Sequence, residues 1–197
     1  SDLSGIELRC LAHYLFPYDG GDYAKQILEG DIHTFNQKAA GLATRDQAKT
    51  WIYATLYGGG DRLIGAIAGG GAKLGKQLKA DYDLAVPAFA TLKNNLKKAY
   101  LRGYIIACDG RVLKIRSEHR ALSQLLQSCG AIIAKQWVLL CFNEIKQKHG
   151  ADAFIMGWIH DEIQVACRMA EEAGRSLGIK IPIASEYSVG SSWDETH

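Results

Sequence analysis

The sequence predicts an α+β fold in which helices dominate and a small antiparallel sheet completes the core. Three observations predict it: several apolar patterns with helical spacing, an Asp-Gly pair between two short apolar runs, and an acidic tip between two more apolar runs near the end. The chain has 197 residues, 48% of them hydrophobic, which is enough to bury a sizeable core. We therefore expect one globular domain, or one domain with a mobile lobe.

The first third of the chain predicts three helices. Ser4 and Glu7 are spaced as a capping box, so a helix should start near Ser4. Short helices should follow over 23–28 and 35–42, with a turn at 30–33 between them. The histidine of that turn indicates nothing by itself.

A fourth helix should begin at Thr44, which forms a second capping-box pair with Gln47, and end at the glycines 58–60. One face of this helix carries two cations followed by two aromatic residues at intervals of four: Arg45, Lys49, Tyr53 and Tyr57. Such a stripe suits a ligand with phosphates at one end and a flat ring at the other. The alternative is that the cations are solvated and the tyrosines cover the edge of the core.

Two further helical features carry charge. Residues 70–76 match the G-x-x-x-x-G-K part of the phosphate-loop motif, but Gln77 stands where the motif needs Ser or Thr, and no strand precedes them. We interpret these residues as a helix-turn-helix junction in a mobile segment. Pro87 should open a helix that ends at Gly103. Its basic stripe fits a phosphate backbone or a solvated face equally well: Lys93, Lys97, Lys98 and Arg102.

The last half of the chain should supply the sheet. Asp109-Gly110 is a two-residue hairpin signal between 104–108 and 111–115, and 121–148 reads as one long helix. Residues 154–167 form a second hairpin signature with an acidic tip. A helix over 169–177 and an extended segment over 179–184 should follow.

The acidic tip places Asp161 and Glu162 side by side. Two carboxylates at a tight turn repel each other, and strand pairing does not explain them, whereas a bound cation would. A solvated acidic turn is the alternative, and the tip alone does not decide between them. Asp2, at the edge of the first predicted helix, would add a third carboxylate.

Composition adds weaker constraints. The formal charge of +2 gives little support to a nucleic-acid partner by itself. Five cysteines without a C-x-x-C pair indicate neither a zinc site nor a disulfide framework, and buried cytosolic thiols are expected. No leader and no membrane-spanning apolar run is apparent, so we expect a soluble cytoplasmic protein without a membrane partner.

Taken together, Asp2, Asp161 and Glu162 with the cationic helix are what phosphoryl transfer needs, because carboxylates hold two divalent ions about 4 Å apart while cations neutralise a triphosphate. A metal-dependent nuclease is less attractive, because it does not need Lys49 or Tyr53.

The chain resembles the family A DNA polymerases, of the bacterial DNA polymerase I type, and most of all the replicative enzymes of T-odd podophages. Residues 2–9 resemble the family's motif A, 45–53 its motif B and 160–162 its motif C. Further matches lie at 30–34, 109–111, 125–128, Trp193 and His197. The resemblance implies palm segments at 1–22 and 104–197, and fingers at 23–103.

The resemblance also implies residue roles. Asp2 and Asp161 would ligate two Mg²⁺ ions with the Leu3 carbonyl, and Glu162 would lie close by. The triphosphate would be held by His33, Arg45 and Lys49, with Lys49 protonating pyrophosphate. Tyr53 would stack on the incoming base and close the pocket against a ribose 2′-hydroxyl with Glu7, whose position also fits a helix cap. Primer-template contacts would come from Tyr57, Arg111, Gln127 and His160.

The family's thumb, upstream palm and common exonuclease domain have no counterpart here. The resemblance therefore implies the palm and fingers part of a polymerase that is split, fragmentary, spliced or degenerate, with a second polypeptide supplying thumb and upstream palm. Its expected activity is templated DNA synthesis from dNTPs on a primer-template, within a bacterial host cell if the gene is phage-borne. The alternative is a non-catalytic DNA-binding or interaction subunit that retains the fold.

Overall fold

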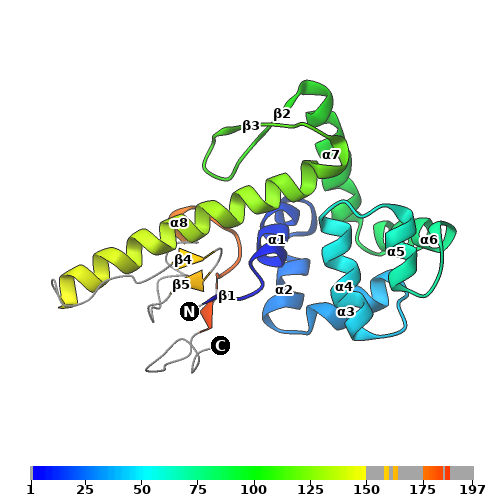
Figure 1. Cartoon of the computed structure of the whole chain (residues 1–197), viewed down its shortest axis with the longest axis horizontal. Helices are drawn as coiled ribbons and strands as arrows, with labels where there is room; N and C mark the ends of the chain where they lie inside the picture. Colours follow the sequence, from blue (N-terminus) through cyan, green and yellow to red (C-terminus); the bar gives the residue numbers. More distant parts are fainter. Residues whose placement is uncertain (1, 150–157, 160–161, 164–174, 184, 187–197) are drawn as a thin grey trace.

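The computed structural model describes residues 2–149, 158–159, 162–163, 175–183 and 185–186. Within these residues it is mostly helical with small antiparallel sheets, so the predicted α+β class is confirmed (Figure 1). The helices are α1 (Ile6–Asp19), α2 (Asp22–Leu28), α3 (Ile32–Ala40), α4 (Arg45–Leu56), α5 (Asp61–Ile67), α6 (Ala72–Ala85), α7 (Pro87–Arg102) and α8 (Ala121–His149), with a 3₁₀ turn, η1 (Glu118–Arg120).

Helices α3 to α6 form a lobe beside α1 and α2 (Figure 1). Its core centres on Asn36 of α3, a buried amide whose oxygen accepts a hydrogen bond of 2.8 Å from the Tyr82 hydroxyl of α6. The Tyr23 hydroxyl of α2 lies 3.3 Å from the same oxygen. Trp51 of α4 packs on the Tyr82 ring at a centroid distance of 5.1 Å. A buried polar network that satisfies its members fixes one arrangement of these helices.

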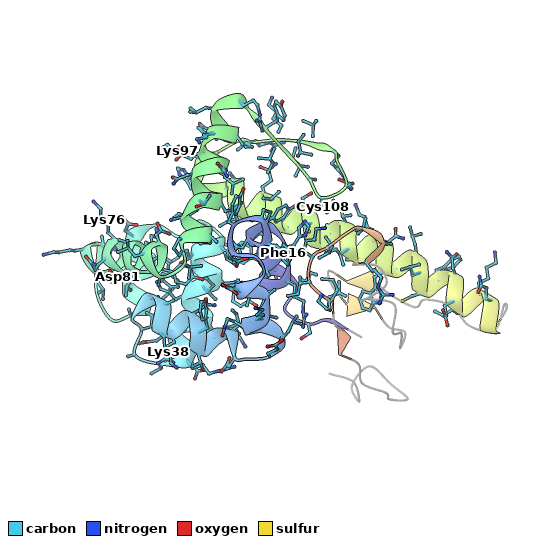
Figure 2. The ribbon with its side chains drawn as sticks, turned by 180° about the vertical axis from the view of Figure 1, so that it is seen from behind. Phe16, Lys38, Lys76, Asp81, Lys97 and Cys108 are labelled. Atoms are coloured by element: carbon cyan, nitrogen blue, oxygen red, sulfur yellow. The ribbon has the colours of Figure 1, made fainter. Side chains whose placement is uncertain are left out.

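Charged residues cover the outside of this lobe. In the view from behind, Lys38 on α3 and both Lys76 and Asp81 on α6 lie around its outer surface (Figure 2). Solvated charges on the outer faces and apolar residues toward Asn36 are what amphipathic helices require.

Helix α8 extends from the middle of the molecule to its left end and packs against α1 and α7 (Figure 1). By length and composition, residues 118–147 could cross a bilayer, so the expectation that no run is long and apolar enough is wrong. Core helices of soluble proteins share this property, and 44% of the most apolar window is buried here. Cys129, Ile133 and Trp137 are fully buried against the neighbouring elements. The apolar composition of α8 therefore serves the core.

Two antiparallel sheets lie on either side of α8. The hairpin of β2 (Tyr104–Ile106) and β3 (Val112–Lys114) confirms the Asp-Gly signal, but its loop has three residues, 108–110, because Ala107 N–H donates to the Arg111 carbonyl. Gly110 has φ 84°, the left-handed conformation that such a loop needs at this position. The second sheet has the order β4-β5-β1-β6, from β1 (Asp2–Leu3), β4 (Trp158–Ile159), β5 (Glu162–Ile163) and β6 (Ser185–Glu186).

Several local predictions hold and others fail. The Thr44–Gln47 capping box is present, and Pro87 is the first residue of α7, as predicted. The Ser4–Glu7 box is wrong: α1 begins at Ile6 after Gly5, with no side-chain cap. The helix predicted over 169–177 lies largely outside the described residues.

The cysteines follow expectation where the structure describes them. Cys10, Cys129 and Cys141 are buried, Cys108 is half-buried, and none of these four forms a disulfide. Figure 2 labels Cys108 in the loop of the β2–β3 hairpin, next to α8.

Glycines at the α5–α6 junction serve close packing. A Cβ atom at Gly65 would overlap the carbonyl oxygen of Gly71, and one at Gly75 would overlap that of Asp61. The glycine-rich sequence, which we interpreted as a mobile junction, is thus explained by backbones that approach too closely for any side chain.

Replacing Gly65 with Ala should therefore destabilise the lobe by about 2 kcal/mol or more, because the backbones must separate to admit a methyl group. Urea unfolding followed by tryptophan fluorescence measures the change. Gly60→Ala is the matched control, since nothing lies within 4 Å of a Cβ there, and it should cost about 1 kcal/mol or less. Equal stability of the two variants would contradict this packing argument.

Candidate active site

Three acidic residues occupy one cross-strand row of the second sheet. Asp2 in β1 is directly opposite Glu162 in β5 on one side and Glu186 in β6 on the other. Like charges at directly opposite positions destabilise an antiparallel sheet. Divalent cations prefer carboxylate oxygens, and a bound cation would offset that repulsion. The backbone register therefore aligns three acidic residues, among them Asp2 and Glu162, which the sequence predicted for a metal site.

The pairing Ile159↔Glu162 leaves only residues 160–161 at the tip of the β4–β5 hairpin, as the sequence predicted for the acidic hairpin. The predicted ligand Asp161 and the predicted primer contact His160 are these two tip residues, and they lie outside the described residues. Among the side chains that the structure describes, no three His, Cys, Asp or Glu groups converge on a metal position. The metal assignment thus depends on the acidic row and its tip.

Helix α4 is held at its N-terminal end by an ion pair. Arg45 donates from Nε to Oδ2 of Asp31 at 2.6 Å and from Nη2 to Oδ1 at 3.2 Å. These hydrogen bonds from Arg45, followed by that of Thr34, hold the pKa of Asp31 well below its usual range. Asp31 also caps α3 by accepting from the backbone N–H of His33 at 3.1 Å. One carboxylate therefore joins the start of α3 to the start of α4.

The structure places His33 in the first turn of α3, so the predicted turn at 30–33 is wrong beyond its first two residues. Asp31 is a good cap because it accepts from the backbone two residues on, which starts the helix at Ile32. The His33 ring faces Tyr53 of α4, with centroids 6.5 Å apart. Burial, and then the charges of Arg45 and Lys49 against that of Asp31, lower the pKa of His33. The imidazole is therefore neutral at pH 7.

The C-terminal end of α4 is held against α1. The hydroxyl of Tyr57, the residue that ends the helix, donates to the Glu7 carboxylate at 3.0 Å. Burial, followed by the nearby Glu7 and Tyr57, raises the pKa of Tyr53. Glu7 therefore does not cap α1, and its carboxylate lies at the aromatic end of the predicted stripe.

The four-residue stripe thus lies along one side of α4, from Asp31 to Glu7. Lys49 is exposed in the middle of it and close enough to His33 to lower its pKa. The helix rises about 1.5 Å per residue, so Arg45 and Tyr53 lie roughly 12 Å apart along its axis. Arg45 lies at the Asp31 end of this face, the His33 ring faces Tyr53, and Tyr57 lies at the Glu7 end.

The remaining predicted contacts lie on other elements. Leu3 is buried in β1, and Gln127 is exposed on α8. Arg111 donates from Nε to Asp109 at 2.7 Å within its own hairpin. The basic stripe of α7 is largely engaged within the fold: Lys93 pairs with Asp83, Lys97 with Glu118, and Arg102 lies over the Tyr104 ring. Among the described residues, no hydrogen bond or ion pair joins these side chains to α4.

Sequence reasoning missed Asp31, Glu186 and Arg9. The capping position of Asp31 was a usable signal, because Asp followed by a helix is a common N-cap. Arg9 is buried in α1 and donates to the carbonyls of Ser4 and Pro182, and burial lowers its pKa. It ties the segment before β6 to α1. Nothing local in the sequence marks Arg9 or Glu186, because their neighbours come from distant segments.

No family model matches the chain. The whole chain aligns with the DNA-directed DNA polymerase of Enterobacteria phage T3 at 42% identity over 230 residues and with that of Escherichia phage T7 at 41% over 230. The predicted kinship with the family A DNA polymerases is confirmed.

The family resemblance extends to more distant relatives. The DNA-directed DNA polymerase of Escherichia phage Phieco32 is 34% identical over 241 residues. The polymerase domain of Pol1 from M. smegmatis, solved with DNA primer-template and dNTP, superposes on this chain with a TM-score of 0.69 at 20% sequence identity. The superposition covers 89% of this chain and 35% of the Pol1 chain. That similarity shows the fold. The chain spans about a third of the length of these phage polymerases, 33% for T3 and T7 and 39% for Phieco32.

The electrostatics at His33 predict its titration. Because its pKa in the folded protein lies below the unfolded value of about 6.5, the unfolded chain takes up a proton first, and stability should fall as the pH drops below about 6.5. Replacing Arg45 with Gln removes a nearby positive charge and should raise the pKa of His33. Histidine NMR titration, assigned with a His33→Asn variant, measures both effects.

Lys25→Gln is the control, because Lys25 pairs with Asp22 on α2 and does not act on His33. It should leave the titration of His33 unchanged. A wild-type His33 that titrates above about 6.5, or one that Arg45→Gln does not shift upward, would contradict the assigned environment.

Proposed function

We propose that this chain is the palm and fingers part of a DNA-directed DNA polymerase, and that it transfers nucleotides from dNTPs to a primer 3′-hydroxyl. The observation that carries this proposal is the register of the second sheet, which aligns Asp2 with Glu162 and joins the first and last segments of the chain. Alignment with the phage polymerases over the whole chain supports it.

Asp2, Asp161 and the Leu3 carbonyl would hold two Mg²⁺ ions, with Glu162 beside them. When bound, the ions would supply activation of the primer hydroxyl and stabilisation of the leaving oxygen. The chain's own contribution is to bring the acidic residues together. Antiparallel pairing does this through backbone hydrogen bonds, so the site does not depend on flexible side chains to assemble.

The face of α4 would bind the nucleotide. Arg45 and Lys49 would contact the triphosphate, and Lys49 would donate a proton to the leaving pyrophosphate. A neutral His33 would donate one hydrogen bond to a phosphate oxygen. Cations at fixed positions stabilise the charge that develops in phosphoryl transfer, which is the main source of catalysis in this chemistry.

Tyr53 would stack on the incoming base, and Glu7 would close the pocket against a ribose 2′-hydroxyl. The Tyr57–Glu7 hydrogen bond supports this placement, because it holds the Glu7 carboxylate at the aromatic end of α4. Tyr57 would lie at the template base, and Arg111, Gln127 and His160 would contact primer and template.

The fingers would comprise 23–103, and the palm 1–22 and 104–197, with α4 closing over a matched nucleotide. The chain spans a third of the phage polymerases, and we propose that a thumb and an upstream palm complete the enzyme, whether on a second polypeptide or on a longer form of this one. The site of action would be the cytoplasm of the bacterial host.

Replacing Asp161 with Ala should abolish primer extension, because one carboxylate ligand of the metal pair is lost. The assay uses a labelled primer-template, dNTPs and Mg²⁺, with the chain in complex with the polypeptide that supplies the missing part. Asp22→Ala is the control, since Asp22 is an exposed residue of α2 outside the candidate site, and it should extend primers like the wild type. Extension that survives Asp161→Ala would favour the non-catalytic, DNA-binding alternative.

A further inference from the structure

Asp31 holds two of the proposed phosphate-binding residues at once. Its carboxylate accepts four hydrogen bonds: from His33 N at 3.1 Å, from Thr34 Oγ1 at 2.8 Å, and from Nε and Nη2 of Arg45 at 2.6 and 3.2 Å. The first two bonds cap α3, and the last two reach α4 across the loop between the helices. Asp31 therefore fixes His33 through the backbone and Arg45 through its side chain.

The contact uses only one edge of the arginine. A guanidinium has five N–H groups in a rigid plane, and Asp31 occupies the Nε edge, with one N–H of Nη2. The two N–H groups of Nη1 donate to no acceptor among the described residues. One N–H of Nη1 and the remaining N–H of Nη2 form a second edge of the fork, which is thus left to bind another anion in bidentate fashion.

Stability does not account for this ion pair. Both side chains are about half exposed, 50% for Arg45 and 42% for Asp31. Exposed ion pairs contribute little to folding because water screens them and two long side chains lose freedom. Its effect is geometric, because the bidentate contact defines the plane in which the guanidinium lies.

We propose that Asp31 is a positioning residue for the nucleotide triphosphate. It orients the free edge of Arg45 toward the phosphates and holds His33 in the adjacent turn, so that α3 and α4 present both groups as one unit. This inference rests on the proposed function, since it takes Arg45 and His33 as triphosphate ligands. The opposite role would be a latch, in which the carboxylate competes with the phosphates for Arg45.

The geometry favours positioning over competition. A competing carboxylate would occupy the edge that the phosphate needs, whereas Asp31 leaves the Nη1 edge unused. The negative charge of Asp31 is already balanced by Arg45, so it adds little repulsion toward an incoming triphosphate. Preorganised donors bind an anion more tightly, because the cost of ordering them has been met in the free protein.

The test uses Asp31→Asn and Asp31→Ser, which both keep a residue type that caps α3 and remove the charge that pairs with Arg45. The full chain is titrated with a deoxynucleoside triphosphate and Mg²⁺ by calorimetry. Both variants should bind about tenfold more weakly than the wild type, the loss expected for a charge-assisted bidentate contact that no longer orients its arginine. Thermal melting of each variant confirms that it is folded.

Asp83→Asn is the matched control, because it removes a similarly close ion pair, to Lys93, that joins α6 to α7 away from α4. It should leave the dissociation constant unchanged. In the double variant with Arg45→Ala, the Asp31→Asn change should have no further effect, because its target is gone. A purely structural role would weaken binding equally in both backgrounds.

Each outcome has a defined meaning. Wild-type affinity in Asp31→Asn would overturn the positioning role, and tighter binding would show a latch instead. Additive losses in the double variant would also overturn it. Absence of triphosphate binding by the wild-type chain would contradict the proposed nucleotide site itself, and with it any role of Asp31 toward that ligand.

Discussion

Pairing of β1 with β5 on one side and β6 on the other brings opposite ends of the chain together. The proposed metal site depends on this register, because it puts Asp2 in line with Glu162. A one-residue slip would move every residue of β1 to the other face of the sheet. The row also carries Glu186, so the sheet contains like charges that strand pairing alone would not favour. An arrangement of residues that lowers local stability in this way is typical of functional sites.

The short strands do not set this register by themselves. β1 has two residues and forms one pair with β5 and two with β6, which leaves few backbone hydrogen bonds to resist slippage. Contacts from α1 add to them: Arg9 donates to the Pro182 carbonyl, and Nδ1 of His13 accepts from the backbone N–H of Lys180 at 3.1 Å. Because α1 directly follows β1, these contacts fix the segment before β6 relative to the acidic strand.

Elements whose signals are local could be predicted from the sequence. The Thr44–Gln47 box, Pro87 at the start of α7 and the long α8 each depend on neighbours within about a turn of helix, and each was confirmed. The Ser4–Glu7 box has the same spacing and failed, because Glu7 instead accepts from Tyr57, fifty residues away. Tertiary contacts override a local cap when a distant partner offers a better hydrogen bond.

The candidate site likewise contains parts that the sequence predicts and parts that it does not. The stripe on α4 could be predicted, since residues four apart on a helix must share a face. Asp31 could not be linked to Arg45 from the sequence, because the loop between α3 and α4 sets that approach. The role of Gly65 and Gly75 was likewise hidden, since a glycine required by close backbone packing and one that permits motion look the same in a sequence.

Both ends of α4 are held by residues that also belong to the proposed nucleotide site, Asp31 at one end and Glu7 at the other. A helix held this way changes position only if a ligand offers its groups better partners than they already have. A triphosphate can do so at the Nη1 edge of Arg45 without breaking the Asp31 contact. At the other end, a sugar that contacts Glu7 would have to share the carboxylate with Tyr57. In the proposed site the two ends would therefore differ: the phosphate end would already be ordered by Asp31, whereas at the sugar end the Glu7 carboxylate would have to accept a second hydrogen bond beside that of Tyr57.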